Sequence, residues 1–291
     1  MMGDFHLRGL RSSIRRMLHR RAFLAAAAAL AATRATAQES AGPRRAPDME
    51  RIRDRGRLVV AVAGFDAPPF VAIGAGGAPA GHDIALAQGM AQALGVGLAL
   101  DRGAESFDAI VDRVARGTVD LGLGRLSATL SRATLVRFSR PYVVLHHALL
   151  LSRPRFARAA PDAAPLAVLA AGDAPLAIVP GTAAADYARG LVAPARLKPY
   201  RRWDPDAVDA VRGGEVIAAL GDEVEARRAL GLRPDAPLLL RAVTLPETRD
   251  PIAAALPWAS TQLLAWVDLY LDGQPPLTVE RLLGAPDKAA E

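Results

Sequence analysis

The chain has 291 residues, of which 51% are hydrophobic and 23% are charged, and it contains no cysteine. This composition is typical of a globular protein with a sizeable core, and it excludes disordered and collagen-like chains. Without cysteine there is no disulfide scaffold, thiol nucleophile or cysteine-based metal site. The first 37 residues hold seven Arg and one Asp, which accounts for the net charge of +6, so no basic surface for nucleic acid is expected in the rest.

The segment 1–37 is predicted to be an export signal. Its arginine-rich beginning is followed by an apolar run over 23–32 and by Ala35-Thr36-Ala37, a small-x-small cleavage site. Arg20-Arg21-Ala22-Phe23-Leu24 has the form of the twin-arginine export motif, and an ordinary secretory signal and a membrane anchor stay open as alternatives. Because no cysteine follows the apolar run, no lipid anchor is expected, and the mature chain is predicted to be soluble in the periplasm.

Apolar spacing predicts alternating helices and strands after a disordered lead-in at 38–47. In chain order, the first elements are a helix over 49–55, a strand over 57–62, a loop or loose hairpin over 65–81, a helix over 84–94, a strand over 96–100, a helix that begins at Glu105 or Ser106 and ends at Gly117, and a strand over 119–123. This order of strands and helices is typical of a parallel, doubly wound sheet with right-handed crossovers.

A similar order returns in the second half of the chain. It contains a strand over 176–179, helices over 182–191 and 204–212, and a strand over 216–220. The apolar stretch 143–152 is expected to be one long strand that crosses between two lobes, because it carries the run Val-Val-Leu-His-His and ends at Arg153-Pro154. A final helix over 260–272 is expected to pack back onto the first lobe.

The predicted fold is therefore α/β, with two doubly wound lobes, a hinge and a ligand cleft between the lobes. The predicted organisation is a signal peptide at 1–37, a lead-in at 38–47, a first lobe made of 48–142 and 246–285, a second lobe at 143–245, and a tail at 286–291.

Catalytic and cofactor motifs do not emerge from the sequence. Gly74-Ala75-Gly76-Gly77 differs from a dinucleotide fingerprint because its third glycine is misplaced and Pro79 stands where a helix should begin. The adjacent His146 and His147 would point to opposite faces of a strand, so they cannot chelate one ion without distortion. No nucleophile elbow and no Walker loop occur. We expect no cofactor, no metal and no enzymatic activity.

From Asp48 to Gly284 the chain resembles the bacterial extracellular solute-binding proteins of amino-acid ABC transporters, whose type members include the lysine/arginine/ornithine- and glutamine-binding proteins. The motifs that carry the resemblance are Ile52-x-x-x-Gly56-x-Leu58-x-Val60-x-Val62, Pro68-Pro69-Phe70, Gly81-His82-Asp83-Ile84, Gly117-x-Val119-Asp120-Leu121, Ser127-x-Thr129-x-x-Arg132, Phe138-Ser139-x-Pro141-Tyr142, Pro180-Gly181-Thr182 and the segment 218–224. The resemblance implies the type II periplasmic binding fold.

A zwitterionic ligand needs a planar cation for its carboxylate, hydroxyl and backbone donors beside it, and an anion for its ammonium group. Ser127, Thr129 and Arg132 follow a strand end, where open α/β sheets bind ligands, and Thr182 begins a helix whose free N–H groups suit a carboxylate. By resemblance, Arg132 grips the α-carboxylate and Asp222 receives the α-ammonium. The alternatives are a surface arginine at 132, a plain helix cap at 182 and a solvated aspartate at 222.

Three further positions concern ligand preference. By resemblance, Phe107 stacks on the ligand, with a core position as the alternative. The family often has a tyrosine at the position of Ala67, and Phe65 is predicted to replace that missing ring. Arg125 stands where the family has a small residue and is expected to favour an acidic or carboxamide-bearing ligand, unless it turns out of the cleft to pair with a surface carboxylate.

The function that the resemblance implies is that of a monomeric periplasmic substrate-binding component of an ABC transporter. It would bind a polar amino acid or a related small carboxylate by lobe closure and would then meet an inner-membrane permease. Two alternatives stay open. One is an accessory binding protein of a periplasmic redox enzyme or sensor, and the other is a cyclohexadienyl-type dehydratase, which has the same fold.

Overall fold

The computed structural model describes residues 45–159 and 164–284. The expected signal peptide, most of the lead-in and the tail at 286–291 lie outside these residues. Across the described part of the chain, no helix combines the length and the apolar character that a bilayer span requires. The final residue of the expected lead-in, Pro47, begins the first described helix, α2.

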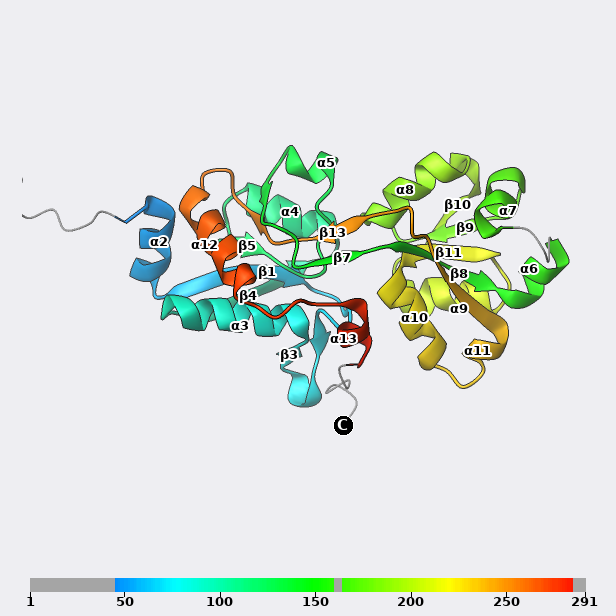
Figure 1. The fold of residues 1–291 in the computed structure, drawn as a ribbon, viewed down its shortest axis with the longest axis horizontal. Helices are drawn as coiled ribbons and strands as arrows, with labels where there is room; N and C mark the ends of the chain where they lie inside the picture. The colour runs from blue at the N-terminus through cyan, green and yellow to red at the C-terminus, as the bar shows by residue number, and fades with distance from the viewer. Residues whose placement is uncertain (1–44, 160–163, 285–291) are drawn as a thin grey trace, which may run out of the picture. The chain divides into compact units, whose positions relative to one another are not determined.

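The first half of the chain forms a five-stranded sheet whose order is β4-β1-β5-β14-β6 (Figure 1). Its strands are β1 (Arg57–Ala63), β4 (Gly97–Ala104), β5 (Leu121–Gly122), β6 (Arg137–Phe138) and β14 (Ala255–Leu256). Strand β1 pairs in parallel with both β4 and β5, as the doubly wound prediction requires, and β14 joins antiparallel from the end of the chain. The strand expected over 119–123 is shorter than predicted.

Helices cover both faces of this sheet. They are α2 (Pro47–Arg55), α3 (His82–Leu94), α4 (Phe107–Ala115), α5 (Leu130–Ala133), α12 (Thr261–Asp272) and α13 (Val279–Gly284). Alternate residues of β1 point to opposite faces. Leu58 and Val60 therefore join the core made with α2, α3 and α12, whereas Ala61 joins the core made with α4. Leu263 and Val267 of α12 belong to the first of these cores, so the predicted return of the last long helix is confirmed.

The second half forms another five-stranded sheet, in the order β10-β9-β11-β8-β12. Its strands are β8 (His147–Ser152), β9 (Leu176–Ile178), β10 (Leu197–Pro199), β11 (Ala218–Asp222) and β12 (Leu240–Thr244). The helices around it are α6 (Arg153–Ala159), α7 (Pro165–Ala171), α8 (Ala183–Leu191), α9 (Val208–Arg212), α10 (Glu223–Gly231) and α11 (Ala236–Leu239), with a π-helical turn, η3 (Trp203–Ala207), before α9. The predicted pair of α/β sheets is thus present.

Two short strands, β7 (Val143–Leu145) and β13 (Asp250–Ile252), pair antiparallel where the chain passes from one sheet to the other (Figure 1). The prediction of one continuous strand over 143–152 was wrong. The strand is interrupted at His146, whose backbone N–H donates to the carboxylate of Glu223 at 2.9 Å instead of to a neighbouring strand. Beyond this break, β8 pairs with β11 and β12 of the second sheet.

The predicted loop or hairpin over 65–81 contains a two-stranded pair, β2 (Ala72–Ile73) and β3 (Pro79–Ala80), with a 3-10 turn, η1 (Ala75–Gly77), between the strands. Gly81 follows this pair with a φ of 114°, and a Cβ atom at this position would lie 2.4 Å from the carbonyl oxygen of Phe70. Only glycine fits there without strain. Residues 64–68, directly after β1, line the site described below.

Candidate functional site

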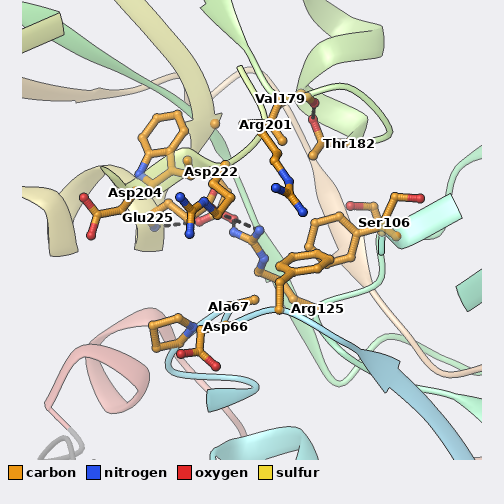
Figure 2. Close-up of a pocket in the computed structure, with 18 of the residues that line it drawn as sticks. Asp66, Ala67, Ser106, Arg125, Val179, Thr182, Arg201, Asp204, Asp222 and Glu225 are labelled. Carbon is orange, nitrogen blue, oxygen red and sulfur yellow. Dashed lines mark hydrogen bonds and ion pairs between the residues drawn. The ribbon is translucent and has the colours of Figure 1, made fainter. Parts of the chain in front are cut away.

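A cavity of about 880 Å³ lies between loops that follow strands of the two sheets (Figure 2). Six of the eight predicted site residues line it: Phe65, Phe107, Arg125, Ser127, Thr182 and Asp222. The other two, Thr129 and Arg132, are not among its lining residues. The cavity walls combine aromatic rings, hydroxyl groups and charged groups of both signs, which is the mixture that a small polar ligand requires.

The loop that carries Arg125 has an unusual backbone. Arg125 has a φ of 57°, and it is the one residue other than glycine with a positive φ in the described part of the chain. Asp83 stabilises this conformation, because its Oδ2 accepts the backbone N–H groups of Gly124 at 2.8 Å and of Arg125 at 2.7 Å. The same oxygen accepts the hydroxyl of Tyr142 at 2.9 Å. A left-handed conformation is unfavourable for a side chain of this size and persists only where the surroundings enforce it.

The guanidinium of Arg125 reaches two carboxylates of the second sheet's elements. Its Nη1 pairs with Asp222, and its Nη2 lies 2.8 Å from Oε1 of Glu225 (Figure 2). The guanidinium carbon lies 5.1 Å from the ring centre of Phe107, within the range of a cation–π contact. Burial alone would lower the pKa of Arg125, but the charges of Asp222 and Glu225 raise it above its usual range.

These contacts correct one premise of the sequence interpretation. Arg125 was expected either to add a free cation to the pocket or to pair at the surface, and the structure has neither arrangement. Its side chain is 7% exposed and is neutralised by two acids inside the cavity, so it cannot by itself select an acidic ligand. Glu225 was not among the predicted site residues. A signal was present, since Asp222-x-x-Glu225 has capping-box spacing and Oδ1 of Asp222 accepts the backbone N–H of Glu225 at 2.9 Å.

Arg132 lies against the cavity wall, and only 6% of the residue is exposed, which excludes the surface-arginine alternative. Its guanidinium donates to Oδ1 of Asp108 at 2.9 Å and 3.0 Å, to the carbonyl oxygen of Ser127 at 3.0 Å and to that of Gly181 at 2.9 Å. These partners come from the elements of both sheets. The hydroxyl of Thr129 caps the short helix α5 by accepting the backbone N–H of Arg132 at 3.3 Å.

Thr182 caps α8, as its sequence context predicts. Its hydroxyl accepts the backbone N–H of Ala185 at 3.1 Å and donates to the carbonyl oxygen of Val179 at 2.8 Å. Phe65 and Phe107 meet edge to face, with ring centres 5.3 Å apart. Phe107 both belongs to the core beneath α4 and lines the cavity, so its core and ligand-facing interpretations are compatible.

Three cavity residues have polar groups that the sequence analysis did not single out for ligand binding. Asp250, on β13, is 7% exposed, and its Oδ2 accepts the hydroxyl of Ser127 at 3.0 Å. His147 is 6% exposed, and its Nδ1 has no hydrogen-bond partner among the described residues. Arg201 extends into the cavity (Figure 2), where no described residue pairs with its guanidinium. No local motif surrounds them, because the fold alone brings these three segments together.

Comparisons with known proteins agree with this architecture. The family model for bacterial extracellular solute-binding proteins, family 3, matches residues 58–272. A search of curated protein sequences found no match.

Among solved structures, the chain is similar to an amino-acid ABC transporter substrate-binding protein, AbpA of Streptococcus pneumoniae, bound to L-arginine. The TM-score is 0.67 at 25% identity, over 82% of this chain and 98% of that one. A putative ABC transporter binding component from Wolinella succinogenes, complexed with lysine, gives a TM-score of 0.66 at 23% identity, over 75% and 89% of the two chains.

A third similar structure is an ancestral amino-acid-binding protein described as a precursor of cyclohexadienyl dehydratase. Its TM-score is 0.66 at 24% identity, over 77% of this chain and 91% of that one. The family model covers most of the chain. The chain therefore belongs to the bacterial extracellular solute-binding proteins of family 3.

Proposed function

We propose that the chain is the periplasmic substrate-binding component of an ABC transporter and that it binds a polar amino acid or a related small carboxylate. One observation carries this proposal: the cavity of about 880 Å³ is lined by charges of both signs from the elements of two sheets, and the chain crosses between these sheets at β7 and β13. Two lobes joined in this way can close on a ligand, and the closed form can then be recognised by an inner-membrane permease. The protein acts as a monomer in this proposal.

The similar structures support an amino acid as the ligand class, since the proteins they represent bind arginine and lysine. A dehydratase is the second candidate, because one similar protein is the precursor of such an enzyme. We propose that this chain has no catalytic activity. Incubation with prephenate and with arogenate, followed by chromatography of the products, separates the two candidates, since turnover of either compound would favour the enzyme.

A thermal-shift screen tests the binding function directly. We expect at least one compound among aspartate, glutamate, glutamine, lysine, leucine and small mono- and dicarboxylates to raise the unfolding midpoint. A ligand at 100 times its dissociation constant stabilises the folded state by about 2.7 kcal/mol, which corresponds to roughly 5–10 °C for a protein of this size. If none of these compounds moves the midpoint, the proposed ligand class is wrong.

Export provides an independent prediction. Changing both Arg20 and Arg21 to Lys should abolish export to the periplasm, because the twin-arginine pathway requires the arginine pair whereas an ordinary secretory signal needs only positive charge. Cell fractionation followed by immunoblotting measures the outcome. Changing Arg15 and Arg16 to Lys is the matched control and should leave export intact. Normal export of the Arg20 and Arg21 variant would favour the ordinary signal and leave the periplasmic location unchanged.

A further inference from the structure

Asp250 is a buried carboxylate with which no cation of the described residues pairs. It lies on β13, at the passage between the two sheets, lines the cavity and is 7% exposed. Ser127 satisfies one of its oxygens through a hydrogen bond of 3.0 Å, and no described cation pairs with it. A buried carboxylate is costly unless a positive group accompanies it. A ligand that enters the cavity can supply this positive group.

The arginines nearest to Asp250 are already engaged. Arg125 is bound by Asp222 and Glu225, and the donors of Arg132 are directed to Asp108 and to two backbone carbonyl groups. At the buried end of the cavity, Arg125 is paired with two carboxylates, those of Asp222 and Glu225, whereas no described cation pairs with Asp250. An ammonium group that enters the cavity would supply the cation that Asp250 lacks.

The Nδ1 atom of His147 is a second buried polar group at this cavity that lacks a described hydrogen-bond partner. His147 follows the strand break at the passage between the sheets and lines the cavity, and only 6% of the residue is exposed. Its Nδ1 has no hydrogen-bond partner among the described residues. Buried nitrogen atoms of this kind are nearly always bonded in native proteins, so a ligand or water is expected to complete the bonding of this ring as well.

We infer that Asp250 is the carboxylate that receives the ammonium group of the ligand, because Arg125 already occupies Asp222 and Glu225. This inference rests on the proposed function and makes it more specific: the ligand carries an amino group beside its carboxylate. The guanidinium of Arg201, with which no described residue pairs, extends into the cavity from the bend after β10 and is available to the ligand's carboxylate in addition to Arg132, and Ser127 orients Asp250. The role that the resemblance gives to Asp222, on β11 of the second sheet, is thereby transferred to a residue on the crossing strand β13.

The charge state of Asp250 makes binding depend on pH. Burial raises its pKa to about 6, the hydrogen bond from Ser127 opposes this effect, and the charge of Asp222 adds to it, while Arg125 and Arg132 oppose it. Only the ionised carboxylate attracts an ammonium group. Affinity should therefore fall as the pH drops from 8 towards 5, by about tenfold per unit below the pKa.

Two other cavity residues have shifted pKa values. Burial lowers the pKa of His147, with the charge of Asp222 opposing this effect and that of His146 adding to it. Burial raises the pKa of Glu225, and the charge of Arg125 opposes that effect. The comparison of wild type with Asp250→Asn separates their effects from that of Asp250, since His147 and Glu225 are present in both proteins.

The experiment uses calorimetry on pairs of compounds that differ only in the α-ammonium group: glutamate and glutarate, leucine and 4-methylpentanoate, lysine and 6-aminohexanoate. For wild type, we expect the amino acid of at least one pair to bind about 30-fold more tightly than its partner. Asp250→Asn should lose about the same factor for the amino acid, close the gap within the pair and remove the pH dependence. Asp101→Asn, which breaks an ion pair with Arg113 outside the cavity, is the matched control.

A stability measurement without ligand shows whether Asp250→Asn folds and adds an independent outcome. Because the folded protein raises the pKa of this acid, the ionised form destabilises it above about pH 6, and Asp250→Asn should unfold at a higher temperature than wild type at pH 8 but not at pH 4. Equal affinity of the amino acid for wild type and Asp250→Asn would overturn the inference and leave the proposed function intact. Absence of binding by every compound, to wild type as well, would overturn both.

Discussion

Arg125→Ala is expected to lower the free energy of unfolding by about 3–5 kcal/mol at pH 8. The substitution removes the guanidinium that Asp222 and Glu225 share and leaves two carboxylates close together in a site where Asp222 is only 6% exposed. Removing one partner of a buried pair costs far more stability than the pair contributes, because the remaining charge is desolvated and no longer has an opposite charge beside it. Urea denaturation followed by circular dichroism measures this loss.

The pH dependence of this effect provides its control. Burial already raises the pKa of Glu225, and removing Arg125 removes a charge that opposes this effect. Glu225 therefore takes up a proton as the pH falls, and the penalty shrinks. The loss of stability should therefore be largest at pH 8 and smaller at pH 5. Arg113→Ala, which breaks a partly exposed pair with Asp101, should cost less than about 1 kcal/mol at either pH. A loss equally small for Arg125→Ala would contradict the structural account of this pair.

The backbone at Arg125 also enters this prediction. Alanine in the left-handed conformation is as strained as arginine, so Arg125→Ala leaves the strain in place and reports the loss of the ion pairs. Arg125→Gly relieves the strain, by about 1 kcal/mol, and should be the more stable of the two variants. The order glycine above alanine, with both below wild type, separates the two contributions.

Much of the fold could be predicted because the apolar spacing within each strand or helix decides which of its residues are buried. The alternation of β1 and the helical spacing of Ile110 and Val114 are decided by the residues themselves, whichever lobe they join. The stretch 143–152 was misjudged for a different reason. Its apolar character is continuous, but its partners change from β13 to β11 and β12 at His146, and pairing over long distances in sequence leaves no local pattern.

The site residues also divide into those whose contacts are local in the sequence and those whose partners are distant. Thr182 and Ser106 could be predicted to begin helices because a cap acts over three residues, and both cap α8 and α4 in the structure. The partners of Arg125 could not be predicted, because 97 residues separate it from Asp222 and the fold alone brings the two together. Asp250 carries no motif, and its segment was expected only as part of the first lobe, with no strand predicted there. Its burial away from any described cation depends on the pairing of β13 with β7, which leaves no local pattern in the sequence.

Arg132→Ala is expected to weaken ligand binding by about 30-fold or more, which corresponds to about 2 kcal/mol. The guanidinium of Arg132 joins the loop after β5 to the turn before α8 through the carbonyl oxygens of Ser127 and Gly181, and the resemblance assigns it the α-carboxylate of the ligand. Either role makes it important for closure on a ligand. Calorimetry with the tightest amino acid from the thermal-shift screen measures the loss, and Arg189→Ala, which removes an exposed pair with Asp186, is the control.

The two roles of Arg132 can be separated with the amide of the same amino acid, which has no carboxylate. If Arg132 grips the carboxylate, removing either group abolishes one shared interaction, so the amide and the Arg132→Ala variant together should lose little more than either change alone. If Arg132 acts only as a tie between Ser127 and Gly181, the two losses should add. Unchanged affinity in Arg132→Ala would exclude both roles, and the carboxylate would then have to be held by Arg201, the cation in the cavity that no described residue pairs.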